Sequence, residues 1–156
     1  MNPKTLESKW QKKWAEAKAY ESEPGGAKEK YFVNCPYPYM NGYLHLGHAF
    51  TYLRADMVSR YQRMQDKNVL FPFAFHCTGT PIVAAAQRVE EGEETQIKAL
   101  KQMGLSDTLI KKFSKPEEWT KHFPDKAIQD LKKFGASIDW RRSFITTSLN
   151  LSLIHI

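Results

Sequence analysis

The sequence contains only two cysteines, Cys35 and Cys77, and it has no long hydrophobic run. Two widely spaced cysteines do not make a disulfide framework, so a reducing compartment is expected. A membrane-spanning helix needs about 18 consecutive apolar residues, and no stretch approaches that length. Residues 1–20 carry charges throughout, which argues against a signal peptide. We therefore expect a cytoplasmic protein with no membrane partner.

Acidic residues are also scarce relative to basic ones. The chain has 17 Asp and Glu against 23 Lys and Arg, a formal charge of +6. Such an excess fits a nucleic-acid partner only weakly, because the lysines are dispersed over helical segments as on solvated helix faces. A hydrophobic content of 42% indicates a folded protein. At 156 residues, the chain can form one domain or part of a larger one.

A strand–helix–strand pattern occupies residues 31–75. Residues 31–35 and 69–75 have strand composition, and residues 45–65 have helical periodicity. One apolar stripe of that helix is formed by Phe50, Leu53, Met57 or Val58, Tyr61 and Met64, and Arg54, Asp56, Arg60 and Arg63 fall mainly outside it. A unit of this size requires a right-handed crossover and parallel strands. The pattern predicts an α/β fold with a parallel sheet and flanking helices.

Further helices are expected on both sides of this unit. Residues 4–19 form an amphipathic pattern in which Trp10 and Trp14 are interpreted as core anchors. Helical segments are also predicted at 82–91, 93–103, 106–113 and 124–134, and the stretch near 92–135 is interpreted as a helical insertion within a domain covering residues 1–150. Residues 138–140 and 143–147 return to strand composition. The tail 151–156 is expected to be non-native, because its codons can be written as a sequencing adapter.

The loop from Pro36 to His48 connects the first strand to the long helix. A strand, a loop and a helix start in this order form a site where backbone N–H groups can face an anion. The dipeptide Asn41-Gly42 tolerates positive φ. His45 and His48 are three residues apart and share a helix face, and Gly47 allows close approach to the backbone. This pattern predicts that the two histidines and the helix dipole hold a nucleotide phosphate.

A second unusual loop, His76 to Pro81, follows the second strand. In an open parallel sheet, ligands bind outside the carboxyl ends of the strands. We therefore expect both loops to open onto the same crevice. His45, His48, His76 and Cys77 include zinc-ligand types, but their spacing matches no standard zinc site, so no metal site is predicted. Neither cysteine has a neighbour that would activate it as a nucleophile.

The chemistry that best uses the two histidines is nucleotidyl transfer. An oxyanion attacks the α-phosphate of a nucleotide and pyrophosphate leaves, so catalysis depends on positioning and electrostatic stabilisation. Histidine donors could contact phosphate oxygens as charge builds up in the transition state. No covalent enzyme intermediate is required.

Three motifs carry a family resemblance. They are Phe32 through His48, Phe71 through Ile82, and Ile138 through Thr147. Together they resemble the leucyl-tRNA synthetases of archaea and the eukaryotic cytosol, a family of class I aminoacyl-tRNA synthetases. The likeness covers about residues 5 to 150, with the motifs in the family's order. It implies the N-terminal part of a Rossmann-like catalytic domain, which activates leucine with ATP and transfers it to tRNA(Leu).

The resemblance also implies roles for individual residues. His45 and His48 would be catalytic and contact ATP phosphates, and Gly47 would let adenine pack against the helix start. Asn41 and Gly42 would shape the loop over the nucleotide, and Mg²⁺ would accompany ATP. Tyr37, Tyr39 and His76 would contact leucine. Bacterial relatives carry an aspartate at the position of His76, and a neutral imidazole supplies no full counter-charge for the amino group of leucine.

The family's second signature, Lys-Met-Ser-Lys-Ser, is absent from these 156 residues. We therefore expect little or no aminoacylation by this chain alone. Three alternatives remain open: an isoleucyl- or valyl-tRNA synthetase fragment, a small nucleotidyltransferase that makes a dinucleotide cofactor, and a non-catalytic nucleotide-binding fragment. The last would bind nucleotide without turnover.

Overall fold

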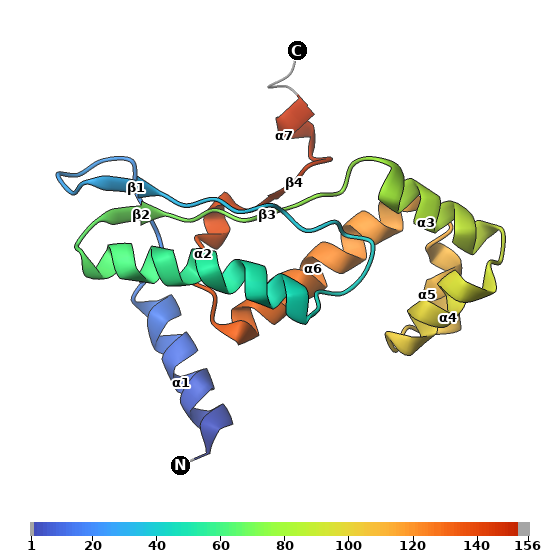
Figure 1. The fold of residues 1–156 in the computed structure, drawn as a ribbon, viewed down its shortest axis with the longest axis horizontal. Coiled ribbons are helices and arrows are strands. Elements are labelled where there is room, and N and C mark those ends of the chain that lie inside the picture. The colour runs from blue at the N-terminus through green and yellow to red at the C-terminus, as the bar shows by residue number, and fades with distance from the viewer. Residues whose placement is uncertain (1, 153–156) are drawn as a thin grey trace. The chain divides into compact units, whose positions relative to one another are not determined.

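The structure is a computed structural model that describes residues 2–152. Its elements in chain order are α1 (Pro3–Glu16), β1 (Lys30–Phe32), α2 (Leu46–Met64), β2 (Asn68–Leu70), β3 (Ala74–Phe75), α3 (Thr80–Glu90), α4 (Glu94–Gln102), α5 (Asp107–Lys112), α6 (Pro116–Phe134), the 3-10 helix η1 (Trp140–Arg142), β4 (Phe144–Ile145) and α7 (Leu149–Ser152) (Figure 1). Residues 153–156, most of the predicted non-native tail, lie outside the described residues.

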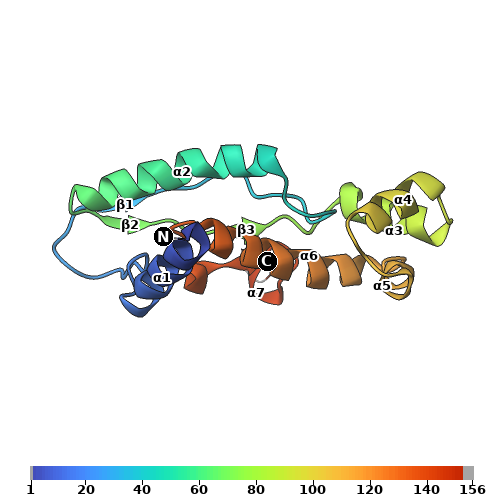
Figure 2. The same cartoon turned by 90° about the horizontal axis from the view of Figure 1, so that it is seen from below.

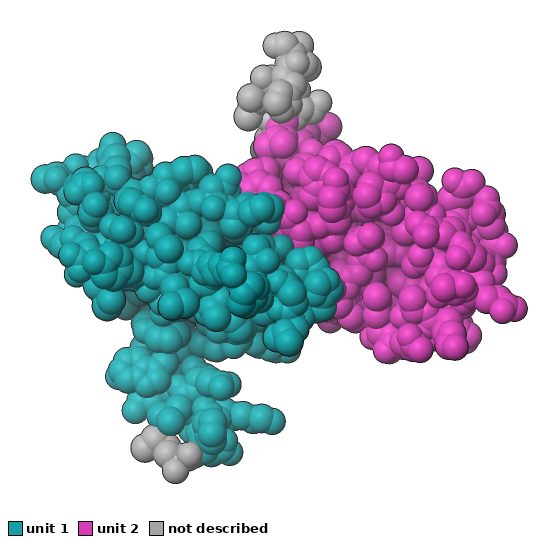
Figure 3. All heavy atoms as spheres, in the orientation of Figure 1, with its two compact units in different colours: residues 1–36, 45–73, 129–143 teal, residues 37–44, 74–128, 144–156 magenta. Residues whose placement is uncertain are grey.

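The chain divides into two compact units, coloured separately in Figure 3. Unit 1 comprises residues 1–36, 45–73 and 129–143, and unit 2 comprises residues 37–44, 74–128 and 144–156. The loop that joins β1 to α2 therefore contributes to both units. Its central residues belong to unit 2, and the histidine pair belongs to unit 1.

In unit 1, the predicted strand–helix–strand unit with parallel strands is confirmed. β1 and β2 pair in parallel, with Lys30 opposite Asn68 and Phe32 opposite Leu70. The ladder continues where the Val33 N–H donates to the Leu70 carbonyl at 2.9 Å. Helix α2 runs along β1 and β2 in the views of Figures 1 and 2. The N-terminus of α2 is thereby held at the end of a βα connection.

The predicted strand 69–75 is two short strands rather than one. β2 ends at Leu70 and β3 begins at Ala74, with Pro72 between them. Proline has no backbone N–H to donate to a sheet ladder, so continuous pairing through this position is disfavoured. β3 belongs to unit 2, where it pairs in parallel with β4, Ala74 opposite Phe144.

The core of unit 2 is apolar and aromatic. Its largest buried side chains are almost fully removed from solvent, namely Phe75, Ile82, Leu100, Phe113, Trp119 and Phe123. The Trp119 indole N–H is also satisfied, donating to the Phe113 carbonyl at 2.7 Å. The near-complete burial of these side chains holds the helices that follow the second loop in place.

Helix α6 is continuous through Pro124, whereas the sequence indicated a separate helix beginning at 124. Phe123, Ala127 and Leu131 are buried at helical spacing on both sides of the proline. Burial of this face stabilises the helix across the position where Pro124 removes one backbone hydrogen bond.

The apolar stripe of α2 faces away from the sheet. Its residues are exposed, whereas Tyr52, Asp56 and Ser59 on the opposite face are buried. Asp56 accepts hydrogen bonds from the Ser137 backbone N–H at 2.5 Å and from the Arg60 side chain at 2.7 Å. Hydrogen-bonded polar side chains thus hold the inward face of α2. In most surface helices the apolar side chains face inward, whereas in α2 the apolar stripe faces outward.

The interpretation of Trp10 as a core anchor is wrong. Its side chain is 47% exposed, and no residue of α1 is buried. Trp14 is half-buried and contacts Tyr20, with ring centroids 5.9 Å apart, while the Arg60 guanidinium lies over its ring. Trp14 therefore attaches α1 to the rest of unit 1 through ring and cation–π contacts at the surface.

Candidate functional site

The two histidines at the start of α2 cap that helix with their side chains. His45 is the N-cap residue, and its Nδ1 accepts a hydrogen bond from the Gly47 N–H at 3.1 Å. The His48 Nδ1 accepts from the His45 N–H at 3.2 Å, which completes a reciprocal capping box. The sequence predicted that backbone N–H groups at this helix start can bind an anion. In the structure, the N–H groups of His45 and Gly47 donate to the two imidazoles instead.

This capping arrangement assigns the protons of both rings. A ring nitrogen that accepts a hydrogen bond carries no proton, so each neutral imidazole must hold its proton on Nε2. Each Nε2–H is then a donor that the capping box does not use. The ring centroids of His45 and His48 lie 4.0 Å apart. The helix start thus presents two adjacent N–H donors, a geometry suited to neighbouring oxygens of one anion.

Burial favours the neutral form of His48. Removal from water lowers the pKa of its imidazole, and the nearby His45 lowers it further. The ring stacks on Tyr52 at 5.9 Å, and Tyr52 in turn meets the edge of Phe73 at 4.9 Å. A buried aromatic column of unit 1 therefore holds the orientation of His48.

Gly47 is required by the His45 ring. A Cβ added at this position would lie 3.0 Å from His45 Cε1 and 3.1 Å from its Nδ1. A side chain at 47 would make the imidazole shift by a few tenths of an ångström from its capping position. The packing of adenine on Gly47 stays a prediction. The structure gives a second reason for a glycine at position 47, which is the close approach of the His45 ring.

In unit 2, the Pro-Tyr-Pro-Tyr segment lies beside the strand end that carries His76. The Met40 N–H donates to the His76 carbonyl at 3.1 Å, and the His76 N–H donates to the Pro38 carbonyl at 2.9 Å. This parallel bridge brings Tyr39 against His76, with ring centroids 4.1 Å apart in an edge-to-face contact. Two of the three predicted leucine-contacting residues are thus neighbours.

The two tyrosines of the segment have different surroundings. Tyr39 is 45% exposed, so it is not a core residue. Tyr37 is half-buried and meets the edge of Phe144 at 5.8 Å. Tyr39 and the His76 imidazole therefore form the accessible part of this surface, and Tyr37 packs against Phe144 of β4.

The Asn41-Gly42 dipeptide tolerates positive φ, but neither residue adopts it in the structure. Packing explains Gly42 instead, because an added Cβ would lie 3.3 Å from Met103 Cε of unit 2. In the second loop, by contrast, Gly79 has a φ of +93° and precedes α3. That conformation is one that glycine adopts at little cost.

Thr146 is a site residue that the sequence patterns did not single out. Its Oγ1 accepts a hydrogen bond from the Cys77 N–H at 2.9 Å and lies 3.3 Å from Thr78 Oγ1. Its own N–H donates to the Phe75 carbonyl at 3.1 Å. Thr146 thus fastens the second loop to β4. Only its membership of the third motif pointed to it.

Asp139 of the same third motif organises unit 1. Burial alone would raise the pKa of its carboxyl, but hydrogen bonds from Arg141 and from the Ser22 N–H lower it. The Arg141 guanidinium contacts it at 2.8 Å and also pairs with Glu21 at 3.2 Å. This ion-pair network ties residues 21–22 to the η1 turn and has a structural role.

Neither cysteine is poised for nucleophilic chemistry. Burial raises the pKa of the Cys35 thiol to about 11 and that of Cys77 to about 11. Both groups are therefore thiols near neutral pH, and the thiol is the unreactive form. Among residues 2–152, no three His, Cys, Asp or Glu side chains are grouped so that they could hold a metal ion.

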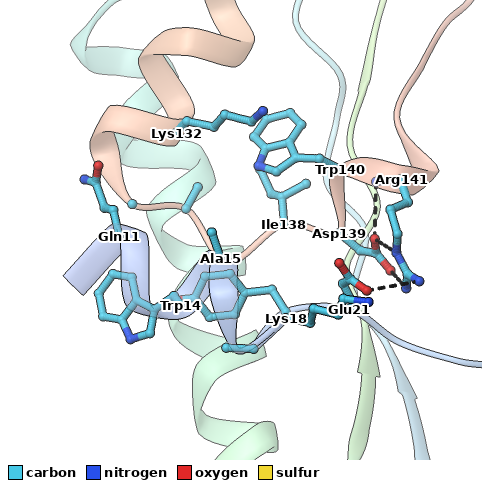
Figure 4. A pocket seen from close by; sticks show the side chains of 14 residues that line it. Gln11, Trp14, Ala15, Lys18, Glu21, Lys132, Ile138, Asp139, Trp140 and Arg141 are labelled. Carbon is cyan, nitrogen blue, oxygen red and sulfur yellow. Dashed lines mark hydrogen bonds and ion pairs between the residues drawn. The ribbon is translucent and has the colours of Figure 1, made fainter. Parts of the chain in front are cut away.

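Unit 1 contains a pocket beside α1 (Figure 4). It measures about 370 Å³ and is lined chiefly by α1 and by the segment after α6. Trp14, Ile138 and Trp140 form its apolar wall, and Lys132 lies over the Trp140 ring at 5.7 Å. None of the predicted ATP- or leucine-binding residues belongs to it.

The structure therefore groups the predicted residues by unit. His45, Gly47 and His48 lie together at the start of α2 in unit 1. Tyr37, Tyr39 and His76 lie together in unit 2. The expectation that both loops open onto one crevice stays a prediction. No helix of the described chain is long and apolar enough to cross a membrane.

Comparisons with known proteins agree with these motifs. A family model described as "tRNA synthetases class I (I, L, M and V)" matches residues 9–154. The leucine--tRNA ligase of Aeropyrum pernix is 49% identical over 147 residues, which is 94% of this chain and 15% of that protein. The cytoplasmic leucine--tRNA ligase of Pongo abelii is 38% identical over 198 residues, covering 94% of this chain and 17% of that protein.

A solved structure shares the fold. It is the ternary complex of Agrobacterium radiobacter K84 agnB2 LeuRS-tRNA-LeuAMS, matched with a TM-score of 0.71 and 24% identity over 94% of this chain and 16% of that chain. The chain thus spans about one-sixth of the length of the relatives it matches. It has the Rossmann-like α/β fold of their catalytic domain, and it belongs to the class I tRNA synthetase family of isoleucine, leucine, methionine and valine enzymes.

Proposed function

We propose that this chain contributes to a leucyl-tRNA synthetase, which activates leucine with ATP and transfers it to tRNA(Leu). The observation that carries the proposal is the reciprocal capping of His45 and His48, which leaves two Nε2–H donors side by side at the start of α2. The names of the most similar relatives, leucine--tRNA ligases, support leucine over the other family substrates.

In the proposed reaction, a carboxylate oxygen of leucine attacks the α-phosphorus of ATP. A new P–O bond forms, the bond to the β-phosphate bridge breaks, and pyrophosphate leaves with the bonding electron pair. Negative charge increases on the non-bridging phosphate oxygens. The Nε2–H groups of His45 and His48 would donate to phosphate oxygens, and preorganised donors of this kind lower a barrier without reorganising during the reaction.

Unit 2 would supply contacts to leucine. Tyr39 offers an exposed ring fixed edge-on to His76, and Tyr37 stands behind it on Phe144. Asn41 and Gly42 would shape the loop over the nucleotide. His76 would accept one hydrogen bond from the leucine amino group. An imidazole gives less electrostatic attraction than a carboxylate, so this contact would orient the substrate more than it would bind it.

Mg²⁺ would arrive with ATP rather than in a site of this chain. The described residues provide no cluster of ligands for it, and magnesium commonly binds through substrate phosphates and water. The tRNA would be bound mainly by regions outside the matched part of the relatives. A cytoplasmic location is proposed because the Pongo abelii relative is named as cytoplasmic.

The decisive experiment measures leucine-dependent exchange between ATP and pyrophosphate. A chimera is made in which this chain replaces the matched residues of the Aeropyrum pernix leucine--tRNA ligase. We expect exchange with leucine, at least tenfold less with isoleucine or valine, and none from the isolated chain. Stronger exchange with isoleucine or valine would reassign the substrate, and a folded chimera without exchange would contradict the proposal.

Variants of the same chimera test the histidine donors. Replacing His48 by Ala should lower exchange by about 100-fold, the usual effect of removing one transition-state donor. His122 of unit 2 is the matched control, because it is also a partly buried histidine with a lowered pKa. His122→Gln should keep most of the activity. Equal losses in the two variants would show that His48 acts only through stability.

A further inference from the structure

Helix α2 carries a continuous apolar face that nothing in unit 1 covers. We call it the α2 outer face, and it consists of Leu46, Phe50, Leu53, Met57, Tyr61 and Met64. Exposed fractions of these side chains run from 41% to 85%. The residues follow one another at intervals of three or four, so they form one seam along the helix. A helix of 19 residues gives this seam a length of about 28 Å.

The seam cannot be explained as the inner side of an amphipathic helix. The inner side is the Asp56 network together with Tyr52 and Ser59, which are buried against unit 1. A contiguous apolar patch of several side chains is uncommon on the surface of soluble proteins and generally marks an interaction site. The α2 outer face therefore has a partner in the functional state.

A groove extends the patch across unit 1. Leu53 forms one wall, and Trp10 of α1 and Phe134 at the end of α6 form others. All three side chains are more than 40% exposed. The partner surface thus includes both the ridge of α2 and the hollow beside it, a shape that fits a second helix lying along α2.

The charges around the seam indicate the chemistry of the partner. Of the three arginines of α2, Arg60 pairs with the buried Asp56 and Arg63 donates to Ser137 on the inner side, so Arg54 is the one beside the seam. The Arg54 guanidinium lies over the Phe50 ring at 4.2 Å, and it has no carboxylate partner among the described residues. Lys133 adds a second cation in the groove lining, which also contains Glu7 and the Asp56–Arg60 pair. A complementary helix would carry aliphatic residues along one seam and Asp or Glu beside them.

The length of the relatives indicates where this helix comes from. The matched region covers only 15% to 17% of the curated relatives, so most of such a synthetase lies outside it. We propose that the α2 outer face docks an amphipathic helix with acidic flanks from the remainder of a leucyl-tRNA synthetase. This inference rests on the proposed function. Docking would hold α2 along its length and so fix the histidine pair at its first turn.

A photo-crosslinker tests the docking directly. In the Aeropyrum chimera, p-benzoylphenylalanine is placed at Met57 on the seam, or at Val58 as the control. Val58 is also exposed on α2 but points to another side of the helix. We expect the Met57 probe to crosslink to a helical, acid-flanked segment outside the matched region, at least tenfold more than the Val58 probe. Equal yields, no crosslink, or a crosslink to a second copy of the chimera would overturn the proposal.

Lysine substitutions give a second measurement. Met57→Lys should lower the melting temperature of the chimera by several degrees and leave that of the isolated chain unchanged. Val58→Lys should change neither. Equal effects of both substitutions would contradict a specific interface. If a chimera does not fold, synthetic peptides that cover the rest of the Aeropyrum protein are added to the isolated chain. At least one acid-flanked peptide should bind, and Met57→Lys should abolish its binding.

The outcome for the interface is separable from the outcome for the reaction. Exchange activity is measured on the chimera without a probe. An active chimera that gives no seam-specific crosslink would refute the docking surface alone. An inactive chimera with the expected crosslink would refute the proposed reaction and keep the interface.

Discussion

The interiors of the two units differ in composition. Unit 2 buries aromatic rings such as Phe113 and Trp119, whereas unit 1 combines buried Phe71 and Phe73 with the buried polar network of Asp56, and it leaves one apolar face of α2 exposed. A dry core needs only shape complementarity, and a polar interior needs every donor and acceptor to be paired. Unit 1 thus depends on paired polar groups as well as on apolar burial, and its exposed α2 face is the surface proposed above to bind a partner.

The aromatic core of unit 2 should give the largest single effect. Trp119→Ala removes a fully buried side chain and leaves the Phe113 carbonyl without its indole donor. We expect a loss of about 4 kcal/mol in the free energy of unfolding, measured with urea. The matched control is Trp10→Ala in unit 1, which should cost less than about 1 kcal/mol because that ring is exposed. Similar losses in the free energy of unfolding for both variants would show that the buried Trp119 stabilises the chain no more than the exposed Trp10 does.

The polar interior of unit 1 comes next. Asp56→Ala leaves the buried Ser137 N–H and the Arg60 Nε–H without their acceptor, while Arg60 Nη2 keeps the Gly135 carbonyl. We expect a loss of about 3 kcal/mol, since removal of one member of a buried pair strands the other. Asp130→Ala, an exposed carboxylate on α6, should change stability by less than about 0.5 kcal/mol. Equal losses in the free energy of unfolding for the two variants would mean that the Asp56 network does not stabilise unit 1.

Gly47→Ala probes the histidine pair without touching either core. The new Cβ would lie 3.0 Å from the His45 ring, which must then shift from its capping position. We expect the chimera to bind ATP about tenfold more weakly, close to 1.4 kcal/mol. Calorimetric titration with ATP measures this loss. A Gly25→Ala variant is the control, because a Cβ there meets nothing within 4 Å. Unchanged affinity in Gly47→Ala would show that the His45 ring position does not matter for the nucleotide.

Each unit contains one histidine whose pKa is lowered chiefly by burial. For His48 the second cause is His45, and for His122 it is Lys126, opposed by Asp125. The unfolded chain protonates these residues at higher pH than the folded chain does. Their contribution to stability is therefore complete above the ordinary histidine pKa and is lost as pH falls through the lowered pKa.

Urea unfolding between pH 7.5 and pH 5 checks this effect. Stability of the wild-type chain should fall toward acid, and either His48→Gln or His122→Gln should make the fall shallower. Glutamine at 48 can still accept the His45 N–H, so it keeps the capping box without titrating. An unchanged slope in His48→Gln would mean that burial of this ring does not disfavour its charged form.

The smallest effect is expected on the outer face of α2. Tyr61→Lys places a charge on an exposed seam residue, so the isolated chain should change in stability by less than about 0.5 kcal/mol. Ser59→Lys, two residues earlier on the same helix, is the contrasting variant. It buries a charge at a fully enclosed position and should unfold unit 1. Circular-dichroism melting curves distinguish the two, and a large loss from Tyr61→Lys would mean that the seam is already covered.

Local patterns predicted most of the elements and part of the site. Helical periodicity located α2 to within one residue at each end, because apolar and polar residues repeat at the helical interval whichever side faces inward. The histidine pair followed from its spacing of three residues. The strand 69–75 was predicted as one element because composition does not show where Pro72 ends the ladder.

The sequence alone determined most of the helices, the parallel βαβ unit, and the grouping of His45, Gly47 and His48, since all of these depend on neighbours within a few turns of chain. It did not show that strand 69–75 is divided, that α6 begins before residue 124, or that residues 138–140 lead into the 3-10 helix η1 instead of a strand. Only the tertiary structure decided which face of α2 is buried. That choice depends on Asp56 meeting Ser137, about 80 residues later in the chain. It also decided the contacts of Tyr39 with His76 and of Thr146 with the second loop. Hydrogen bonds between distant segments leave no periodic trace in the sequence, because their partners are chosen by the fold.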